Sequence, residues 1–189
     1  MALETTFRVL RSSLHKLHDA LNALRMTVGD RPPNDEAAVA DGLENALLDM
    51  LGKLQDAHAA GREAYNAVGG PVDLDRARRA LTKCQESFHA IEQQFATDLV
   101  SYEKVKQLER IGRARRHEWI PWANSAKQGI DQCREPIKQI SMAIASCWQE
   151  LAERLGMISV SVQNTNVGQR LITKHTDGVE IEDVVHKGT

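Results

Sequence analysis

The chain has 189 residues with a formal net charge of -2, and 42% of its residues are hydrophobic while 26% are charged. This length suits one domain, or one domain with an appendage, and the small net charge excludes a global attraction to nucleic acid or to a membrane surface. Aromatic residues make up only 4%, which argues against a large β-sandwich, and no apolar run approaches the ~18 residues of a membrane-spanning helix.

The first predicted element is a helix over residues 3–28. Apolar residues recur there in steps of three and four without a polar interruption, the spacing of a heptad seam that faces partner helices. This stripe consists of Leu3, Phe7, Leu10, Leu14, Leu17, Leu21, Leu24 and Val28. Residues 29–35 then combine a glycine near the C-cap, a proline pair and an Asn–Asp cap. That combination predicts the end of one helix and the start of the next.

A second helix is predicted over residues 36–68. Its seam changes from leucines to small residues towards the C-terminal half, where Ala57, Gly61 and Ala64 take their place. Small seam residues allow a neighbouring backbone to approach closely, or leave room for a large side chain opposite. A ligand cavity is a third alternative.

The third predicted helix is the longest, from Asp73 as its N-cap to about Gly112. It contains Glu86 and His89 in a Glu-x-x-His pattern, which di-iron carboxylate bundles use in two inward-facing copies. Only one copy exists here, and the phase of the seam turns both side chains outward. We therefore predict a solvated helix surface at this position and no metal site.

A fourth helix is predicted from about Pro121, an acceptable first-turn position for proline, to about Leu155. Pro136 lies inside it and predicts a kink. Together these segments predict an all-α fold: an antiparallel up-down-up-down four-helix bundle of long, coiled-coil-like helices over residues 1–156.

Residues 157–189 have a different pattern and predict a short β-hairpin or meander. Ile158, Val160 and Val162 alternate with polar residues, and weaker candidates follow at 170–174 and 179–181. Such a ribbon is marginal alone in water. Two alternatives remain open: strand addition to a partner or sister subunit through Ile158, Val160 and Val162, or a partly disordered tail.

Basic residues gather at the predicted junction of the third and fourth helices. From residue 103 to 116, six basic and two acidic residues give a local charge of +4, and two tryptophans follow. Arginines can clamp phosphates or an acidic protein surface, and tryptophans can stack on bases. A structural explanation is the alternative. Basic side chains stabilise the C-terminal end of a helix, where the helix dipole is negative, and tryptophans can cap the end of a bundle. The candidate binding residues are Arg110, Arg113, Arg115, Arg116, His117, Trp119 and Trp122.

Arg110 and His117 also form an Arg-x6-His pattern. This pattern resembles the motif of HEPN-type ribonucleases, which are helical bundles too, and the resemblance covers eight residues. It implies that the arginine would position a phosphate and that the histidine would act in acid–base cleavage of RNA, usually across a dimer.

The remaining reactive side chains predict no chemistry. Cys84, Cys133 and Cys147 fall on predicted core seams without a CxxC motif, which favours reduced, buried thiols. His15 and His18 form a helical i,i+3 pair that can bind a metal if a third ligand arrives. The sequence places no acidic or cysteine partner near them, so we expect ordinary surface residues.

No Ser/His/Asp order, glycine-rich phosphate loop or pair of inward carboxylates can be found, so we predict no catalytic residue, metal or cofactor. The sequence favours a non-enzymatic scaffold, adaptor or subunit of a larger assembly, which acts through protein–protein contacts of the β tail and the Arg/Trp end. The partner would be another protein or a second copy. The alternative is an RNA-binding protein or HEPN-like ribonuclease that uses Arg110 and His117. The N-terminal residues lack the pattern of a signal peptide, which predicts a cytoplasmic protein.

Overall fold

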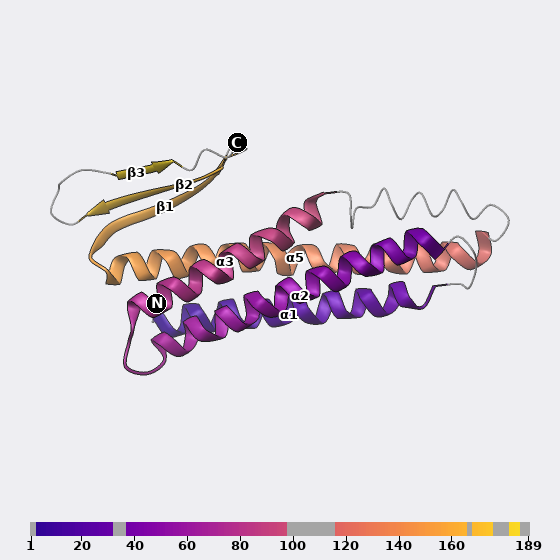
Figure 1. Cartoon of the computed structure of the whole chain (residues 1–189), viewed down its shortest axis with the longest axis horizontal. Coiled ribbons are helices and arrows are strands. Elements are labelled where there is room, and N and C mark those ends of the chain that lie inside the picture. Colours follow the sequence, from indigo (N-terminus) through magenta and orange to yellow (C-terminus); the bar gives the residue numbers. More distant parts are fainter. Residues whose placement is uncertain (1–2, 32–36, 98–115, 166–167, 176–181, 186–189) are drawn as a thin grey trace.

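The computed structural model describes residues 3–31, 37–97, 116–165, 168–175 and 182–185. Long helices dominate this part of the chain (Figure 1). They are α1 (Leu3–Gly29), α2 (Ala37–Val68), α3 (Leu74–Ala96) and α5 (Arg116–Arg154). The predicted all-α class is thereby confirmed for the body of the molecule.

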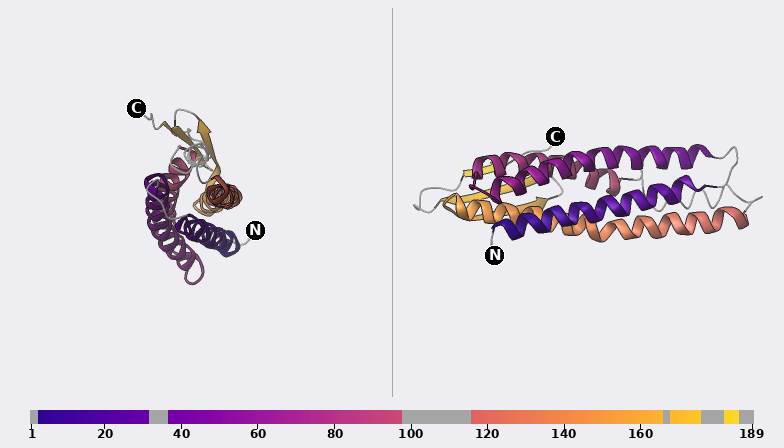
Figure 2. Two further views of the ribbon diagram at one scale, coloured as in Figure 1. Left: turned by 90° about the vertical axis from the view of Figure 1, so that its right-hand side faces the viewer. Right: turned by 90° about the horizontal axis from the view of Figure 1, so that it is seen from below.

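The helices pack side by side as a bundle. α1 lies between α2 and α5, α2 also packs against α3, and α3 contacts α5. Figure 2 shows the helices along and across their common long direction. This arrangement buries one face of each helix against its neighbours, as the heptad-like seams require.

The predicted stripe of α1 forms the centre of the core. All eight residues of this stripe are buried. Four of them have no exposed surface: Leu10, Leu14, Leu17 and Leu21. Because these residues recur at three- and four-residue spacing, they share one face of the helix. The sequence prediction for this helix is confirmed.

Two glycines let neighbouring helices come close to α1. A Cβ atom on Gly61 of α2 would lie 2.8 Å from Leu14 Cδ1 and 3.6 Å from Cys84 Sγ of α3. A Cβ atom on Gly129 of α5 would lie 2.8 Å from Leu24 Cδ1. The small seam residues of α2 therefore allow close approach at Gly61, where leucine and cysteine side chains fill the space.

The third helix is shorter than predicted. Asp73 is its N-cap as expected, because Asp73 Oδ1 accepts a hydrogen bond from Arg76 N at 2.9 Å. The helix ends at Ala96, however, and Thr97 is extended with φ -79° and ψ 157°. The Thr97 hydroxyl donates to the Gln94 carbonyl at 3.2 Å, a local bond that competes with helix continuation. A continuous helix to Gly112 is thus wrong, and residues 98–112 lie outside the described residues.

The last helix begins earlier than predicted. α5 starts at Arg116, so Pro121 and Pro136 both lie inside it. It ends at Arg154, and Gly156 follows with φ +80°. Glycine is the residue that adopts this left-handed conformation without strain. The chain reverses there and runs back as the first strand (Figure 1).

Three strands follow the bundle: β1 (Met157–Thr165), β2 (Gly168–His175) and β3 (Glu182–Val185). They pair antiparallel in the order β1-β2-β3. Val162 is opposite Leu171, and Arg170 is opposite Val185. The third strand lies just beyond the predicted candidate at 179–181, which falls outside the described residues.

We expect the close approach at Gly129 to be visible in stability. Gly129→Ala adds a methyl group against the buried Leu24, whereas Gly52→Ala meets no atom within 4 Å. Replacing glycine by alanine inside a helix stabilises it by about 1 kcal/mol, while overpacking a core costs about 1–3 kcal/mol. In urea unfolding, Gly52→Ala should be more stable than the parent protein, and Gly129→Ala should be less stable than Gly52→Ala by about 1–3 kcal/mol. Equal stabilities of the two variants would contradict the packing described here.

Candidate functional site

The structure places only part of the predicted Arg/Trp end. Arg110, Arg113 and Arg115 lie outside the described residues. Arg116, His117 and Trp119 belong to the first turns of α5, where the structure describes the backbone but not these side chains. Whether this set binds a partner stays a prediction, and so does the HEPN-like pairing of Arg110 with His117. Trp122 is the member whose side chain is described.

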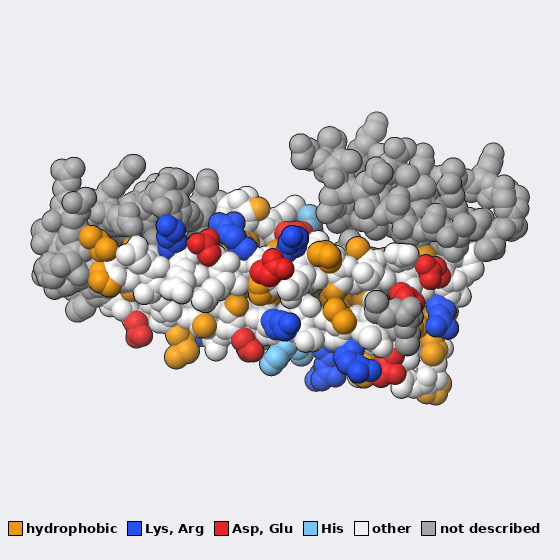
Figure 3. Space-filling model, turned by 180° about the vertical axis from the view of Figure 1, so that it is seen from behind, with side chains coloured by type: hydrophobic (Ala, Val, Ile, Leu, Met, Phe, Trp, Pro, Cys, Tyr) orange, Lys and Arg blue, Asp and Glu red, His pale blue; other side chains and the backbone are white. Residues whose placement is uncertain are grey.

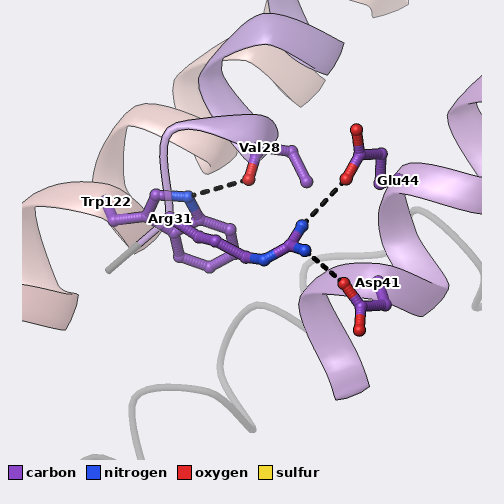
Figure 4. A network of polar contacts seen from close by, with 5 residues as sticks. All are labelled: Val28, Arg31, Asp41, Glu44 and Trp122. Atoms are coloured by element: carbon purple, nitrogen blue, oxygen red, sulfur yellow. Dashed lines mark hydrogen bonds and ion pairs between the residues drawn. The ribbon is translucent and has the colours of Figure 1, made fainter. Parts of the chain in front are cut away.

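Trp122 lies inside the bundle. Its side chain and backbone together are 6% exposed, and its indole Nε1 donates a hydrogen bond to the Val28 carbonyl at 3.4 Å (Figure 4). The last carbonyls of a helix have no partner within the helix, and α1 ends one residue later at Gly29. Trp122 therefore satisfies the end of α1 and joins α5 to it. Of the two alternatives for this tryptophan, the structure favours the packing role.

Arg31 connects the same end of the bundle to α2 through ion pairs. Its guanidinium pairs with Asp41 Oδ1 at 2.5 Å and with Glu44 Oε2 at 2.8 Å (Figure 4). The two carboxylates are three residues apart, so they share one face of the helix. The Arg31 side chain is 25% exposed, and a guanidinium held by two carboxylates is no free site for an anion. This contact was not predicted, although an arginine in the interhelical turn before an Asp-x-x-Glu pair is a signal for it.

The buried thiols are confirmed as core residues. Cys84, Cys133 and Cys147 are free and have no exposed surface. Burial raises the pKa of Cys84 and of Cys133 to about 12. Burial also raises the pKa of Cys147, and the nearby Cys84 and Glu150 add to that shift. Because the thiolate is the nucleophile and the metal ligand, these neutral thiols are suited to packing and not to catalysis.

Glu86 and His89 face outward, as the helix phase predicts. Both residues are exposed, and His89 Nδ1 lies 3.7 Å from Glu92 Oε2 on the same helix. Among the residues that the structure describes, no three His, Cys, Asp or Glu side chains are placed to hold a metal ion.

Two surface grooves were not predicted. One, of about 430 Å³, lies between α1 and α5, and the exposed apolar side chains Val9 and Met142 line it. Thr6 also lines this groove, and its buried hydroxyl has no hydrogen-bond partner among the described atoms. The other groove, of about 630 Å³ between α2 and α3, has charges of both signs, including the Glu63–Arg76 ion pair at 3.5 Å. Both are lined by side chains from two helices, and the two helices of the first groove, α1 and α5, are distant in sequence.

The other predicted contact is the first strand. Ile158, Val160 and Val162 lie in β1, where the structure describes the backbone but not these side chains. One edge of β1 is paired with β2 along nearly its whole length. Its other edge has no strand partner among the described residues. An unpaired strand edge exposes a row of backbone donors and acceptors.

No protein-family model, curated protein or solved structure matches the chain. Among its described residues, no helix is long and apolar enough to cross a lipid bilayer.

Trp122 should be a major contributor to stability. We expect Trp122→Ala to lower the free energy of unfolding by about 3–5 kcal/mol, because it removes a large buried side chain. Trp122→Phe keeps most of the packing but leaves the Val28 carbonyl without its donor, which should cost about 1 kcal/mol. Ile120→Ala is the matched control, since Ile120 is 39% exposed and should change stability by less than about 0.5 kcal/mol. Denaturant unfolding checks all three, and a Trp122→Ala change as small as the control's would contradict this role.

The thiols provide a test that needs no variant. In the native protein at about pH 8, none should react with a thiol-specific disulfide reagent within minutes, whereas all three should react in denaturant. In the unfolded chain, the cysteine thiols lose their protons near the ordinary pKa of 9.0. In the folded protein, the thiols of Cys84 and Cys133 lose theirs only near a pKa of about 12. The folded state therefore holds more protons in between, and stability should fall as the pH rises from about 9 to 12. Fast labelling of the native protein would show that the core opens readily.

Proposed function

We propose that this chain is a non-enzymatic scaffold, adaptor or assembly subunit that acts through protein–protein contacts. In this proposal the bundle is an antiparallel four-helix body, and the β strands beyond Gly156 are a separate appendage that contacts a partner. The observation that carries the proposal is the edge of β1 that has no strand partner among the described residues.

The connection between bundle and strand supports this proposal. α5 continues to Arg154, and the left-handed Gly156 turns the chain directly into the nine residues of β1. Because so few residues separate them, the strand has little freedom relative to α5. A strand edge held in one orientation on a rigid body loses less entropy on pairing than a free tail would.

We infer that the first partner is a second copy of the chain. Two β1 strands can pair antiparallel about a two-fold axis, so that each copy supplies the same surface. Val160 and Val162 are on one face of the strand because they alternate along its regular part, whereas the pairing is irregular between Met157 and Ser159, around Ile158. The two valines would add an apolar contact beside the backbone hydrogen bonds. The residues from Arg110 to Trp119 are a second proposed contact, for an acidic protein surface.

The interior of the bundle also fits a role without catalysis. The buried residues of its described helices are apolar apart from Thr6 and Ser13. The three thiols are buried and, with their pKa values raised, neutral. Reduced thiols are typical of a reducing compartment, which supports the proposed cytoplasmic location.

Light scattering tests the proposed self-association. We expect the full chain at tens of micromolar to have a mass at least twice the 21.0 kDa of one copy. The double variant Val160→Lys/Val162→Lys places like charges across the proposed contact, and it should have the mass of a single copy. A monomeric parent protein, or a double variant with the mass of the parent, would contradict strand pairing between copies.

The matched control is Val72→Lys. Val72 is 56% exposed in the connection between α2 and α3, far along the sequence from β1. This substitution replaces an exposed valine by lysine outside the strand. The mass of the variant in light scattering should equal that of the parent protein. Helical circular dichroism of all variants checks that the bundle is intact.

A further inference from the structure

Two helices bring histidines and arginines together on one surface. α1 presents Arg11, His15 and His18, and α2 presents His58 and Arg62. Within each helix these residues are three or four apart, so they share one face. We call these five residues the histidine cluster. Figure 3 shows histidine side chains gathered beside Lys and Arg side chains on one edge of the molecule.

The imidazole rings are close neighbours. The ring centroids of His15 and His18 are 6.4 Å apart and the rings are nearly parallel, at 5°. The centroid of His58 lies 6.3 Å from that of His15, across the contact between the two helices. The sequence predicted His15 and His18 as surface residues but did not place His58 beside them.

One carboxylate touches this group. Asp19 Oδ2 lies 3.7 Å from His15 Nε2, and Asp19 Oδ1 lies 3.6 Å from His18 Nδ1. The expectation that no acidic residue accompanies these histidines was therefore wrong, because Asp19 is one helical turn from His15. Asp19 is 66% exposed and lies against two of the three imidazoles.

Near Arg11, the carboxylate of Glu4 is already engaged. Glu4 accepts hydrogen bonds from the Tyr65 hydroxyl at 3.1 Å and from Arg8 at 3.4 Å. The Arg11 guanidinium lies over the Tyr65 ring, 5.5 Å from its centroid. On the α2 side, Arg62 lines the groove between α2 and α3 together with the carboxylates of Asp56 and Glu63.

The surroundings of His58 oppose its protonation. The pKa of His58 is lowered, first by burial and then by His15, Arg11 and His18 of α1 and by Arg62 of its own helix. A cation would meet two permanent guanidinium charges here. An anion would relieve the repulsion among all five groups.

We propose that the histidine cluster is a binding site for a tetrahedral oxyanion of the phosphate type, whose binding is coupled to proton uptake by the imidazoles. Guanidinium and imidazolium groups both donate charge-assisted hydrogen bonds to such an anion. The site is open to it, because the side chains of His15 and His18 are 68% and 39% exposed. This site is independent of the strand contact proposed above.

The pH dependence follows from linkage. A bound dianion favours the charged imidazole, so it raises the histidine pKa values. The complex then holds more protons than the free protein, and affinity increases as the pH falls. For one coupled histidine with an ordinary pKa of about 6.5, the protonated fraction changes about 10-fold between about pH 7.5 and 5.5.

Sulfate is the probe, because its charge is constant over this range. The full chain is titrated with sulfate against chloride at constant ionic strength, and the imidazole proton signals are followed by NMR. We expect sulfate to bind at least about 10-fold more tightly at about pH 5.5 than at 7.5. Equal binding at both pH values, or shifts that chloride reproduces, would overturn the proposal.

Variants connect the binding to these residues. His15→Gln/His58→Gln should weaken sulfate binding at about pH 5.5 by about 10-fold and reduce its pH dependence, because His18 is the one imidazole of the cluster that remains. Arg11→Gln should weaken binding at both pH values, because its charge does not titrate. The control is His89→Gln, since His89 is exposed on α3 and should leave the affinity unchanged. Unaltered affinity in the double variant would overturn the assignment.

Inorganic phosphate and a phosphoserine peptide, titrated at about pH 5.5, distinguish a free ion from a phosphorylated side chain. Tighter binding of one of them identifies the source of the oxyanion. Binding of neither would overturn the proposal.

Discussion

Leu14 and Leu24 of α1 each lie against a glycine of a neighbouring helix, at Gly61 of α2 and at Gly129 of α5. These two contacts set how closely three of the helices approach. A fully buried leucine contributes about 1.5–3 kcal/mol relative to an exposed one, but only if the surrounding atoms fill the space around it. The stripe of α1 can be buried on both sides because the glycines remove the Cβ atoms that would keep the backbones apart.

The two tryptophans with described side chains hold α5 to different neighbours. Trp122 donates to the Val28 carbonyl of α1 at 3.4 Å. Trp148 donates to Gln85 Oε1 of α3 at 2.6 Å. Each indole combines a large apolar area with one directed hydrogen bond. α5 is therefore fixed against α1 near its beginning and against α3 near its end. The second contact matters because α3 is the shortest of these helices and packs beside α5 over a limited stretch.

Sequence reasoning recovered what depends on local periodicity. The stripe of α1 and the N-cap Asp73 depend on neighbours within a few residues, and both predictions were right. The end of α3 was missed because apolar residues continue at helical spacing beyond Phe95, whereas the backbone responds to Thr97 and its bond to the Gln94 carbonyl.

A packing role was one of two alternatives for Trp122, but its hydrogen-bond partner could not be read from the sequence alone. Its partner is a carbonyl 94 residues away, and nothing in the local pattern of α5 indicates which helix end it meets. The backbone of β1 matches the predicted strand, but the binding roles of Ile158, Val160, Val162 and the arginines depend on a partner that the chain alone does not specify.

The histidine cluster shows how a surface depends on the core beneath it. His58 is three residues before Gly61 on α2, and His15 follows Leu14 on α1. α1 and α2 are consecutive, so the register that seats Gly61 against Leu14 also brings His58 to His15. A shift of α2 by one heptad, about 10.5 Å along the helix, would separate the rings and place a larger residue against Leu14. The close approach at a glycine is therefore what determines which charged side chains meet on the outside. Because the histidine cluster lies across the contact between α1 and α2, a change of charge at these histidines acts directly on this pair of helices. The register of the same pair seats Gly61 against Leu14 in the core.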